Sequence, residues 1–194
     1  MRTAVRATIA TIVLVILTGV LYPLVMTGFA HIALGNDAAG SLVEHDGTDV
    51  GSSRIGQDWT GKQWFYGRPS AVDYDASTSG GTNLGPTSKP LSNDIVKQIR
   101  TILKLEGPYT GGLTATQIPV DLLTSSSSGL DPDISPAAAR FEAPRIAAVR
   151  SIPLAQVMQL IDDHTSGKTL GFLGEPRVNV LALNMALDAA APMP

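Results

Sequence analysis

The sequence predicts an α+β protein, with one N-terminal transmembrane helix followed by a single extracytoplasmic α+β domain. Three observations predict this architecture. No Lys, Arg, Asp or Glu occurs between Arg6 and Asp37. Basic residues precede that stretch and acidic residues follow it. The rest of the chain alternates short apolar runs, amphipathic helical patterns and loops rich in Gly, Ser and Pro, which is typical of an α+β domain.

The composition excludes several classes of protein. Charged residues make up 16% of the 194 residues, below the roughly 25% of an ordinary soluble domain. Lys and Arg number 14 against 17 Asp and Glu, which argues against a nucleic-acid partner. The chain has no cysteine, so disulfides, thiol catalysis and Cys-ligated zinc are excluded.

The transmembrane segment is predicted to run from Ile9 to Leu34, between a cytoplasmic N-terminus of residues 1–8 and a domain of residues 36–194. As a helix it would be about 39 Å long, enough to cross a hydrocarbon core of about 30 Å with some tilt. A cleaved signal peptide is the alternative, with a small-residue site near Ala33. The apolar run exceeds the roughly 7–15 residues of a signal core, which favours the membrane anchor.

Flanking charge predicts the orientation of this segment. Arg2 and Arg6 precede it, whereas Asp37, Glu44 and Asp46 follow it. Because positive charge is retained on the cytoplasmic side, the N-terminus is expected in the cytoplasm and the C-terminal domain outside it. The predicted location is the inner (plasma) membrane, as a single-pass protein in contact with lipid.

A proline in the middle of the predicted span indicates more than a simple anchor. Pro23 removes one backbone hydrogen bond and is expected to kink the helix. Thr18 and Gly19 lie one turn earlier, and Tyr22 is a polar residue deep in the span. Such positions usually face protein, so Thr18, Gly19, Tyr22 and Pro23 are the predicted helix-packing residues. A tolerated kink facing lipid is the alternative.

The exported part is predicted to contain strands and four or five helices. Strands are expected within Ser52–Trp64, Ile118–Thr124 and Leu170–Leu173. Ile95, Ile99 and Ile102 form an apolar stripe that predicts a helix from Asp94 to Lys104, capped by Ser92 or Asn93. Ser135 and Pro136 begin another helix, which Pro144 is expected to interrupt. The last two helices are expected over Ser151–His164 and Arg177–Ala189.

Two long polar loops are the candidate functional regions, since a long loop in a compact domain is usually functional or disordered. One spans residues 77–92 and the other residues 125–132. Either they contact a partner or they brace each other within the domain. The candidate residues are Ser79, Gly80, Gly81, Thr82, Asn83, Leu84, Gly85, Ser128, Gly129, Leu130 and Asp131.

No motif predicts a catalytic centre or a metal site. Gly167-Lys168-Thr169 is the end of a phosphate-binding loop, but Asp162 stands where its first glycine should be. An acid there opposes phosphate, so a helix end followed by a solvated lysine is favoured. The three histidines are widely separated, without the spacing of metal ligands. The serine run lacks a Gly-x-Ser-x-Gly context, so its serines are interpreted as turn residues.

Several segments in series resemble the C subunit family of the Kdp potassium-transporting ATPase. Each segment is weakly specific, whereas together they cover most of the chain in the family's order. The matching segments are Tyr22-Pro23, Ile55-Gly56-Gln57, residues 66–71 and 79–86, Asp121-Leu122-Leu123-Thr124, residues 128–132 and 134–139, and residues 174–181.

This resemblance implies an accessory subunit with two protein partners, a channel-like subunit that selects potassium and a P-type ATPase subunit. It also implies a catalytic chaperone that raises the ATP affinity of the ATPase subunit. The phosphorylation motif Asp-Lys-Thr-Gly-Thr is absent from this sequence, so ATP and Mg²⁺ are expected on the partner. A membrane-tethered extracytoplasmic binding domain unrelated to a pump is the alternative function.

Overall fold

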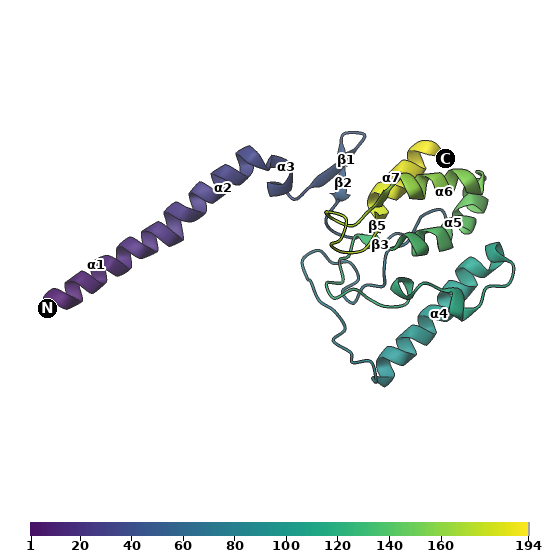
Figure 1. Cartoon of the computed structure of the whole chain (residues 1–194), viewed down its shortest axis with the longest axis horizontal. Helices are drawn as coiled ribbons and strands as arrows, with labels where there is room; N and C mark the ends of the chain where they lie inside the picture. Colours follow the sequence, from purple (N-terminus) through teal and green to yellow (C-terminus); the bar gives the residue numbers. More distant parts are fainter. Residues whose placement is uncertain (194) are drawn as a thin grey trace. The chain divides into compact units, whose positions relative to one another are not determined.

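The computed structural model describes residues 1–193 and divides the chain into two compact units. The first unit ends at Ser52 and the second begins at Ser53. The first contains a long apolar helix and a β-hairpin, and the second contains helices with a small antiparallel sheet (Figure 1). The α+β class predicted from the sequence is therefore confirmed. The boundary between the units lies beyond the apolar span, so the hairpin belongs to the first unit.

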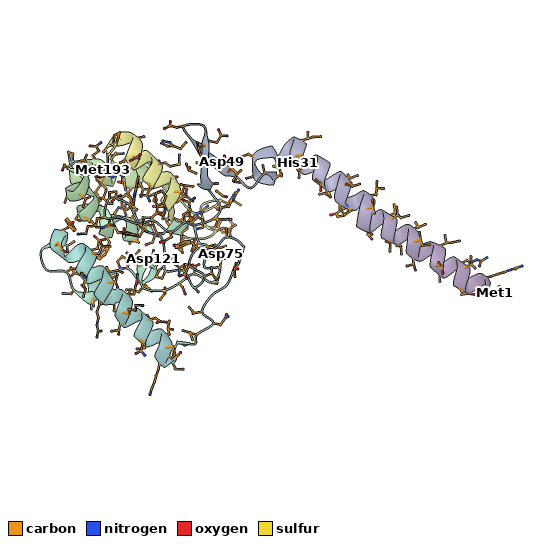
Figure 2. The ribbon with its side chains drawn as sticks, turned by 180° about the vertical axis from the view of Figure 1, so that it is seen from behind. Met1, His31, Asp49, Asp75, Asp121 and Met193 are labelled. Atoms are coloured by element: carbon orange, nitrogen blue, oxygen red, sulfur yellow. The ribbon has the colours of Figure 1, made fainter. Side chains whose placement is uncertain are left out.

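The N-terminal helix comprises α1 (Arg2–Ile16), a π-helical turn (Leu17–Leu21) and α2 (Tyr22–Ala33). In residues 1–193 this continuous stretch is the one helix that is long and apolar enough to cross a membrane, with a mean hydropathy of 2.5. Its side chains point outward on all sides and none of them is buried (Figure 2). A helix that is apolar all round suits a lipid environment.

The kink expected at Pro23 is replaced by a local change of helix type. Figure 1 shows α1 and α2 in line. In a regular α-helix the Pro23 ring would meet the carbonyl of Gly19, four residues earlier. Gly19 lies inside the π-helical turn, which is wider than an α-turn. The Thr18 hydroxyl donates to the Leu14 carbonyl oxygen at 2.8 Å within this region.

The first unit ends in structure that the sequence analysis did not predict. A short helix, α3 (Gly35–Ala38), precedes an antiparallel hairpin of β1 (Leu42–His45) and β2 (Thr48–Ser52). Asp46 and Gly47 make the turn with φ values of 50° and 75°. An Asp-Gly pair with both φ angles positive is the preferred two-residue hairpin turn. The Asp46-Gly47 pair was therefore the sequence signal for this hairpin, and it was not recognised.

Four helices build the second unit: α4 (Lys89–Thr110), α5 (Pro136–Arg150), α6 (Leu154–Asp163) and α7 (Val180–Ala190). Helix α5 packs against α4 and α6, and α6 packs against α7. A three-stranded antiparallel sheet has the order β3 (Asp133–Ile134), β5 (Arg177–Asn179) and β4 (Thr165–Ser166). Side chains with no exposed surface fill the core: Phe65, Ala138, Ala139, Ala143, Ile146, Val157, Ile161, Val178, Leu183 and Leu187.

The predicted start of α5 is confirmed, but its predicted interruption is wrong. Ser135 is the N-cap, and its hydroxyl accepts a hydrogen bond from the Ala138 amide at 3.0 Å. The helix continues through Pro144 to Arg150. Both neighbours of Pro144, Ala143 and Arg145, are completely buried. Their packing holds the helix together where local preference alone would break it.

Helix α4 is longer than predicted at both ends. It begins at Lys89 after the N-cap Ser88, with Pro90 in the first turn where a missing amide costs nothing. It also continues through Pro108 and ends at Thr110, followed by the C-cap Gly111, which has a φ of 65°. The extra C-terminal turn places Glu106 in the interior, where it is 1% exposed. The predicted end at Lys104 was therefore wrong, and the extension brings a carboxylate into the core.

Three strand predictions were wrong. Ile118–Thr124 contains a 3₁₀-helical turn (Val120–Leu122), which follows another at Ala115–Gln117. In Leu170–Leu173 only Leu173 forms a bridge, to Thr169. The last helix begins at Val180 rather than Arg177, because Arg177–Asn179 pairs as β5. The third prediction was a strand between Ser52 and Trp64, but β2 ends at Ser52 and no strand follows it before Trp64. At Gln63 and Trp64 the backbone is bonded to side chains instead of to a neighbouring strand.

Candidate functional site

The two polar loops are hydrogen-bonded to each other. The Gly80 amide donates to the Ser128 carbonyl oxygen at 2.8 Å, and the Ser79 hydroxyl donates to the same oxygen at 3.2 Å. The Ser70 hydroxyl, just before the first loop, donates to the Gly129 carbonyl oxygen at 2.7 Å. These contacts show that part of each loop braces the other within the domain.

Arg68 fastens the second loop from the other side. Its guanidinium donates to Asp131 Oδ2 at 3.1 Å and to the carbonyl oxygens of Thr124 and Ser125 at 3.4 and 3.3 Å. The Tyr74 hydroxyl donates to the Arg68 carbonyl oxygen at 2.5 Å. Burial, with a further contribution from the Asp131 charge, raises the pKa of Tyr74 to about 12, so this phenol stays protonated and keeps donating.

The serines of the second loop are turn residues, as the sequence analysis interpreted them. Ser126 Oγ accepts from the Gly129 amide at 2.9 Å, and Ser128 Oγ accepts from the Leu130 amide at 3.1 Å. The Leu130 carbonyl oxygen accepts from the Gly56 amide at 2.9 Å. The amides of Gly129 and Leu130 are thus already bonded inside the protein and are not open to phosphate.

The tip of the first loop is free of such bracing. Thr82, Asn83 and Gly85 are exposed, and Leu84 is half-buried. Asn83 has a φ of 54°, a conformation that asparagine tolerates better than most residues. The candidate residues therefore fall into two groups. Residues 79–81 and 128–131 hold the loops together, whereas residues 82–85 leave a surface.

A buried ion network that was not predicted from the sequence connects α4, α5 and residues 62–64. Arg145 on α5 is completely buried. Its Nε donates to Glu106 Oε1 of α4 at 2.7 Å, and its Nη2 donates to Glu142 Oε2. Its Nη1 donates to the carbonyl oxygens of Lys62 and Trp64, the latter at 2.8 Å. One cation therefore faces two carboxylates and also binds the chain before the first loop.

Polar side chains of α5 and α7 explain why residues 62–65 do not form a strand. Arg150 Nε donates to the Gln63 carbonyl oxygen at 3.0 Å. Asn184 on α7 is bonded to both the amide and the carbonyl oxygen of Phe65, each at 2.9 Å. Side chains from α5 and α7 thus satisfy the backbone of residues 62–65, where a strand would use a neighbouring strand.

The α5 sequence contained a partial signal for the network. Glu142 and Arg145 are three residues apart, which places them on the same side of a helix. The predicted break at Pro144 separated them and hid that relation. Glu106 could not be assigned from the sequence, because it lies beyond the predicted end of its helix.

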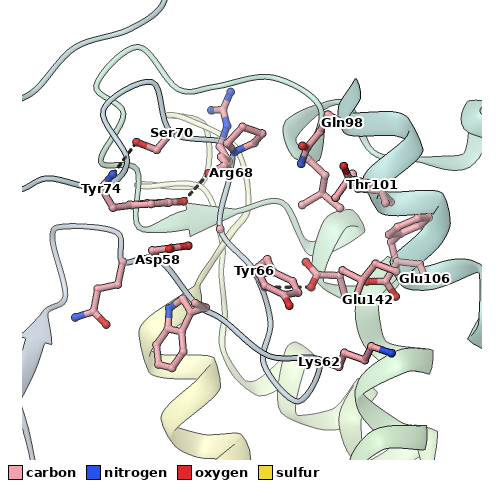
Figure 3. Close-up of a pocket in the computed structure, with 18 of the residues that line it drawn as sticks. Asp58, Lys62, Tyr66, Arg68, Ser70, Tyr74, Gln98, Thr101, Glu106 and Glu142 are labelled. Carbon is pink, nitrogen blue, oxygen red and sulfur yellow. Dashed lines mark hydrogen bonds between the residues drawn. The ribbon is translucent and has the colours of Figure 1, made fainter. Parts of the chain in front are cut away.

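A cavity of about 540 Å³ opens beside the network (Figure 3). Its walls come from residues 57–74, from α4 and from α5. Figure 3 shows Glu142 between Tyr66 and Glu106 at one end, with Arg68, Ser70 and Tyr74 at the other. Aromatic side chains of Trp59, Tyr66, Tyr74 and Phe141 line it. Size and lining are in the range of small-molecule sites.

Two carboxylate oxygens at this cavity have no hydrogen-bond partner among the described residues. They are Glu106 Oε2 and Glu142 Oε1, and both side chains are 2% exposed. Burial raises the pKa of Glu106, opposed by Arg145. Burial also raises the pKa of Glu142 to about 8, again opposed by Arg145, while Glu106 adds to the rise. Glu142 therefore holds its proton more tightly than an ordinary glutamate does.

The raised pKa of Glu142 predicts how stability changes with pH. Its ordinary pKa is 4.5 and its folded value is about 8. Between these values the folded state binds more protons than the unfolded state, so the free energy of unfolding should fall as pH rises. The slope contributed by one group is at most about 1.4 kcal/mol per pH unit. Urea unfolding from pH 5 to pH 8 measures it. Glu142→Gln should flatten the profile, and an unchanged slope in that variant would contradict the assignment.

The predicted packing residues of the apolar helix lie on its free surface. Tyr22 is 62% exposed, and a Cβ atom added at Gly19 would meet no atom within 4 Å. Thr18 and Gly19 lie in the π-helical turn, with Tyr22 and Pro23 immediately after it. The surface around Gly19 is thus open enough for another helix to approach closely.

Among residues 1–193 no group of three or more His, Asp or Glu side chains is arranged to hold a metal ion. Lys168, from the fragment that resembles a phosphate-binding loop, pairs with Glu175 at 3.1 Å on the surface. The structure thus defines a class of protein, an α+β domain preceded by one helix that fits a single-pass membrane protein.

Comparison with known proteins narrows this class to one family. The family model described as "KdpC: K+-transporting ATPase, c chain" matches residues 4–189. A relative from Bradyrhizobium diazoefficiens, named potassium-transporting ATPase KdpC subunit, is 48% identical over 95% of this chain and 96% of its own. A relative of the same name from Variovorax paradoxus is 53% identical over 90% of this chain and 90% of its own. Another, from Koribacter versatilis, is 45% identical over 100% of this chain and 97% of its own. The chain belongs to the KdpC family, as its motifs predicted.

Proposed function

We propose that the protein is an accessory, non-catalytic subunit of an ATP-driven potassium uptake complex, in which a channel-like subunit and a P-type ATPase subunit are its partners. The observation that carries this proposal is the family match over residues 4–189, which includes both the apolar helix and the second unit. The sequence has no Asp-Lys-Thr-Gly-Thr motif, so phosphoryl transfer and the ATP and Mg²⁺ it needs belong to the ATPase partner.

Within the complex, we infer that the subunit raises the ATP affinity of its partner indirectly. The amides of Gly129 and Leu130 are bonded to serine hydroxyls of their own loop, and the Gly80 amide is bonded to Ser128. These groups are therefore unavailable to phosphate. An effect on ATP affinity then requires that the subunit bind one conformation of the pump better than another.

Potassium-dependent ATP hydrolysis tests this function. The two partner subunits are purified with and without the chain, and KM for ATP is measured in each case. We expect KM to be several-fold lower with the chain, whereas calorimetric titration of the full-length chain alone with ATP should give no saturable isotherm. Unchanged hydrolysis would contradict the accessory role. A 1:1 isotherm that is lost in a folded Ser128→Ala variant would replace indirect coupling by direct binding.

The orientation proposed for the subunit places the second unit outside the cytoplasm. Arg2 and Arg6 precede the apolar helix and Asp37, Glu44 and Asp46 follow it. The positive-inside rule then predicts a cytoplasmic N-terminus in the inner membrane. A reporter enzyme active only in the periplasm, fused after Pro194, should be active. The matched control is a reporter enzyme that is active only in the cytoplasm, fused at the same position. Activity of that reporter would show that the C-terminus lies in the cytoplasm and would contradict the proposed orientation.

The apolar helix is proposed to pack against a partner helix through Thr18, Gly19, Tyr22 and Pro23. Replacing residues 9–34 by a Leu/Ala sequence should leave the second unit folded and reduce the recovered complex by about tenfold, because close helix approach depends on small residues. The measurement is the yield of partner subunits after affinity purification of each chain. An equal yield would show that the helix serves only as an anchor.

The tip of the first loop, residues 82–85, is the proposed partner-contact surface of the second unit. It is the part of the candidate region that is exposed and not fixed by the second loop. The braced residues Ser79, Gly80, Gly81, Ser128, Gly129, Leu130 and Asp131 would position it. Substitutions at Thr82 and Asn83 should therefore change complex yield more than they change the melting temperature.

A further inference from the structure

Two buried acids, Glu106 and Glu142, line the cavity between α4, α5 and residues 57–74 and share one buried cation. Arg145 is one buried cation, and it faces the two buried carboxylates of Glu106 and Glu142. Each carboxylate uses one oxygen on Arg145, while its second oxygen has no partner among the described residues. Buried polar atoms in folded proteins are nearly always paired. Both glutamates line the cavity, so a ligand there can supply the missing donors.

The deep end of the cavity selects for positive charge. Lys62 and Lys104 also line the cavity, but both are exposed, and solvent screens their charges. Arg68 lies at the other end of the cavity, where its Nη1 and Nη2 donate to Asp131 and two carbonyl oxygens and its Nε has no partner among the described residues. At the end formed by Glu106 and Glu142, the charge of the two acids exceeds that of Arg145 once both are ionised, so an anion there would be repelled and a cation attracted.

The walls distinguish an organic cation from a bare metal ion. The volume of about 540 Å³ is that of a small-molecule site and far exceeds one ion. Trp59, Tyr66 and Phe141 present aromatic surface to it, which attracts organic cations through their π faces. In the part of the chain that the structure describes, the acids and histidines form no cluster that would hold a metal ion.

We propose that this cavity binds a small organic cation with N–H donors, an alkylammonium or alkylguanidinium group, whose charge is held by Glu106 and Glu142. The N–H groups donate to Glu106 Oε2 and Glu142 Oε1, and the alkyl part lies against the aromatic walls. This site is separate from the two polar loops, and the proposal does not depend on the accessory role in the pump.

Binding of the cation is linked to the proton on Glu142. The charged and titratable groups around Glu142 are Arg145 on its own helix, Glu106 and Lys104 on α4, Asp58, Lys62 and Tyr66 from the preceding segment, and Asp121. Because burial raises the pKa of Glu142 to about 8, a cation bound at this carboxylate competes with a proton. The affinity should therefore rise by up to about tenfold per pH unit below the pKa of Glu142.

Calorimetry on the full-length chain in detergent micelles tests the proposal with three probes. The first is n-butylguanidinium, which is charged at every pH used. The second is n-butylurea, a neutral analogue of the same size and with similar donors, and the third is K⁺ alone. We expect a saturable 1:1 isotherm for n-butylguanidinium, at least about tenfold tighter than for n-butylurea, and tighter at pH 8 than at pH 6.5. Equal binding of the urea, or equally tight binding of K⁺, would overturn the proposal.

Two tryptophan substitutions at exposed positions on α4 test the site without removing a buried side chain from the core. Thr101 lines the cavity from an exposed position on α4, so Thr101→Trp should fill the cavity without disturbing the core. Lys97→Trp adds the same ring one turn earlier, at an exposed position outside the cavity. Binding should be lost in the first variant and kept in the second. Glu142→Gln should weaken binding and remove its pH dependence. Unchanged binding in Thr101→Trp would place the ligand elsewhere.

Discussion

Arg145→Met should lower the free energy of unfolding of the second unit by about 3–5 kcal/mol. The substitution leaves Glu106 and Glu142 buried without their cation, and it leaves the carbonyl oxygens of Lys62 and Trp64 without their shared donor. Removing one partner from a buried ion network costs about 3–5 kcal/mol. Small domains have about 5–15 kcal/mol of stability in total, so this loss removes a large share of it.

Urea unfolding of the full-length chain, followed by tryptophan fluorescence, measures this effect. Trp59 and Trp64 lie next to each other, with ring centroids 5.2 Å apart, beside the segment that Arg145 holds. Arg140→Met is the matched control, because Arg140 lies on the same helix and pairs with Asp162 on the surface. An exposed pair contributes at most about 1 kcal/mol. Equal stability of the two variants would mean that the buried network does not hold the fold.

Arg145→Lys should also be destabilising. Lysine keeps the charge but has a single nitrogen, whereas Arg145 uses three nitrogens on four partners. A planar guanidinium meets several acceptors at once, and an ammonium group cannot reproduce that geometry. A lysine variant as stable as the natural chain would show that charge alone matters at this position.

Gly129→Val should be the most damaging substitution in the polar loops. Gly129 has a φ of 68°, and a Cβ atom there would lie 2.8 Å from the Gly80 carbonyl oxygen and 2.7 Å from a Val72 methyl group. A side chain in this backbone region costs about 1–3 kcal/mol, and the contact with Gly80 pushes the loops apart. We expect a total loss of about 2–4 kcal/mol, seen as a lower midpoint in urea.

Gly85→Val is the control for that experiment. Nothing lies within 4 Å of a Cβ atom at Gly85, so its substitution should change stability by no more than about 0.5 kcal/mol. Gly81→Val should be intermediate, because its Cβ would lie 3.0 Å from the Ser127 carbonyl oxygen. If the Gly129 and Gly85 variants unfold at the same urea concentration, the loops do not brace each other in solution.

The sequence predicted those features that depend on local pattern. The apolar span was visible because charge is absent from residues 7–36, and the Ser135 cap because Ser-Pro is a strong helix start. The two polar loops were located, although the first ends at Ser88 rather than Ser92 because α4 begins at Lys89. Which of their residues brace and which are exposed depends on pairs about fifty residues apart, such as Gly80 with Ser128. No local pattern contains that information.

The features that were missed depend on tertiary packing that overrides local preference. Pro108 and Pro144 both lie inside helices, although proline alone disfavours that position by about 3 kcal/mol. Residues 62–64 were predicted as part of a strand, but arginine side chains bind their backbone carbonyl oxygens. Glu106 and Arg145 are charged residues, which are usually expected on the surface. Their burial is evident only once both helices are in place.

Affinity purification from native membranes tests most directly whether the chain is a subunit of a potassium-transporting ATPase. The full-length chain carries a C-terminal tag, is extracted in mild detergent, and its partners are identified by mass spectrometry. We predict that a multi-span potassium-selective subunit and an ATPase with the Asp-Lys-Thr-Gly-Thr motif are recovered with it in fixed proportion, and that the preparation hydrolyses ATP when K⁺ is added. Recovery of the chain alone, or with partners that include no P-type ATPase, would contradict the account.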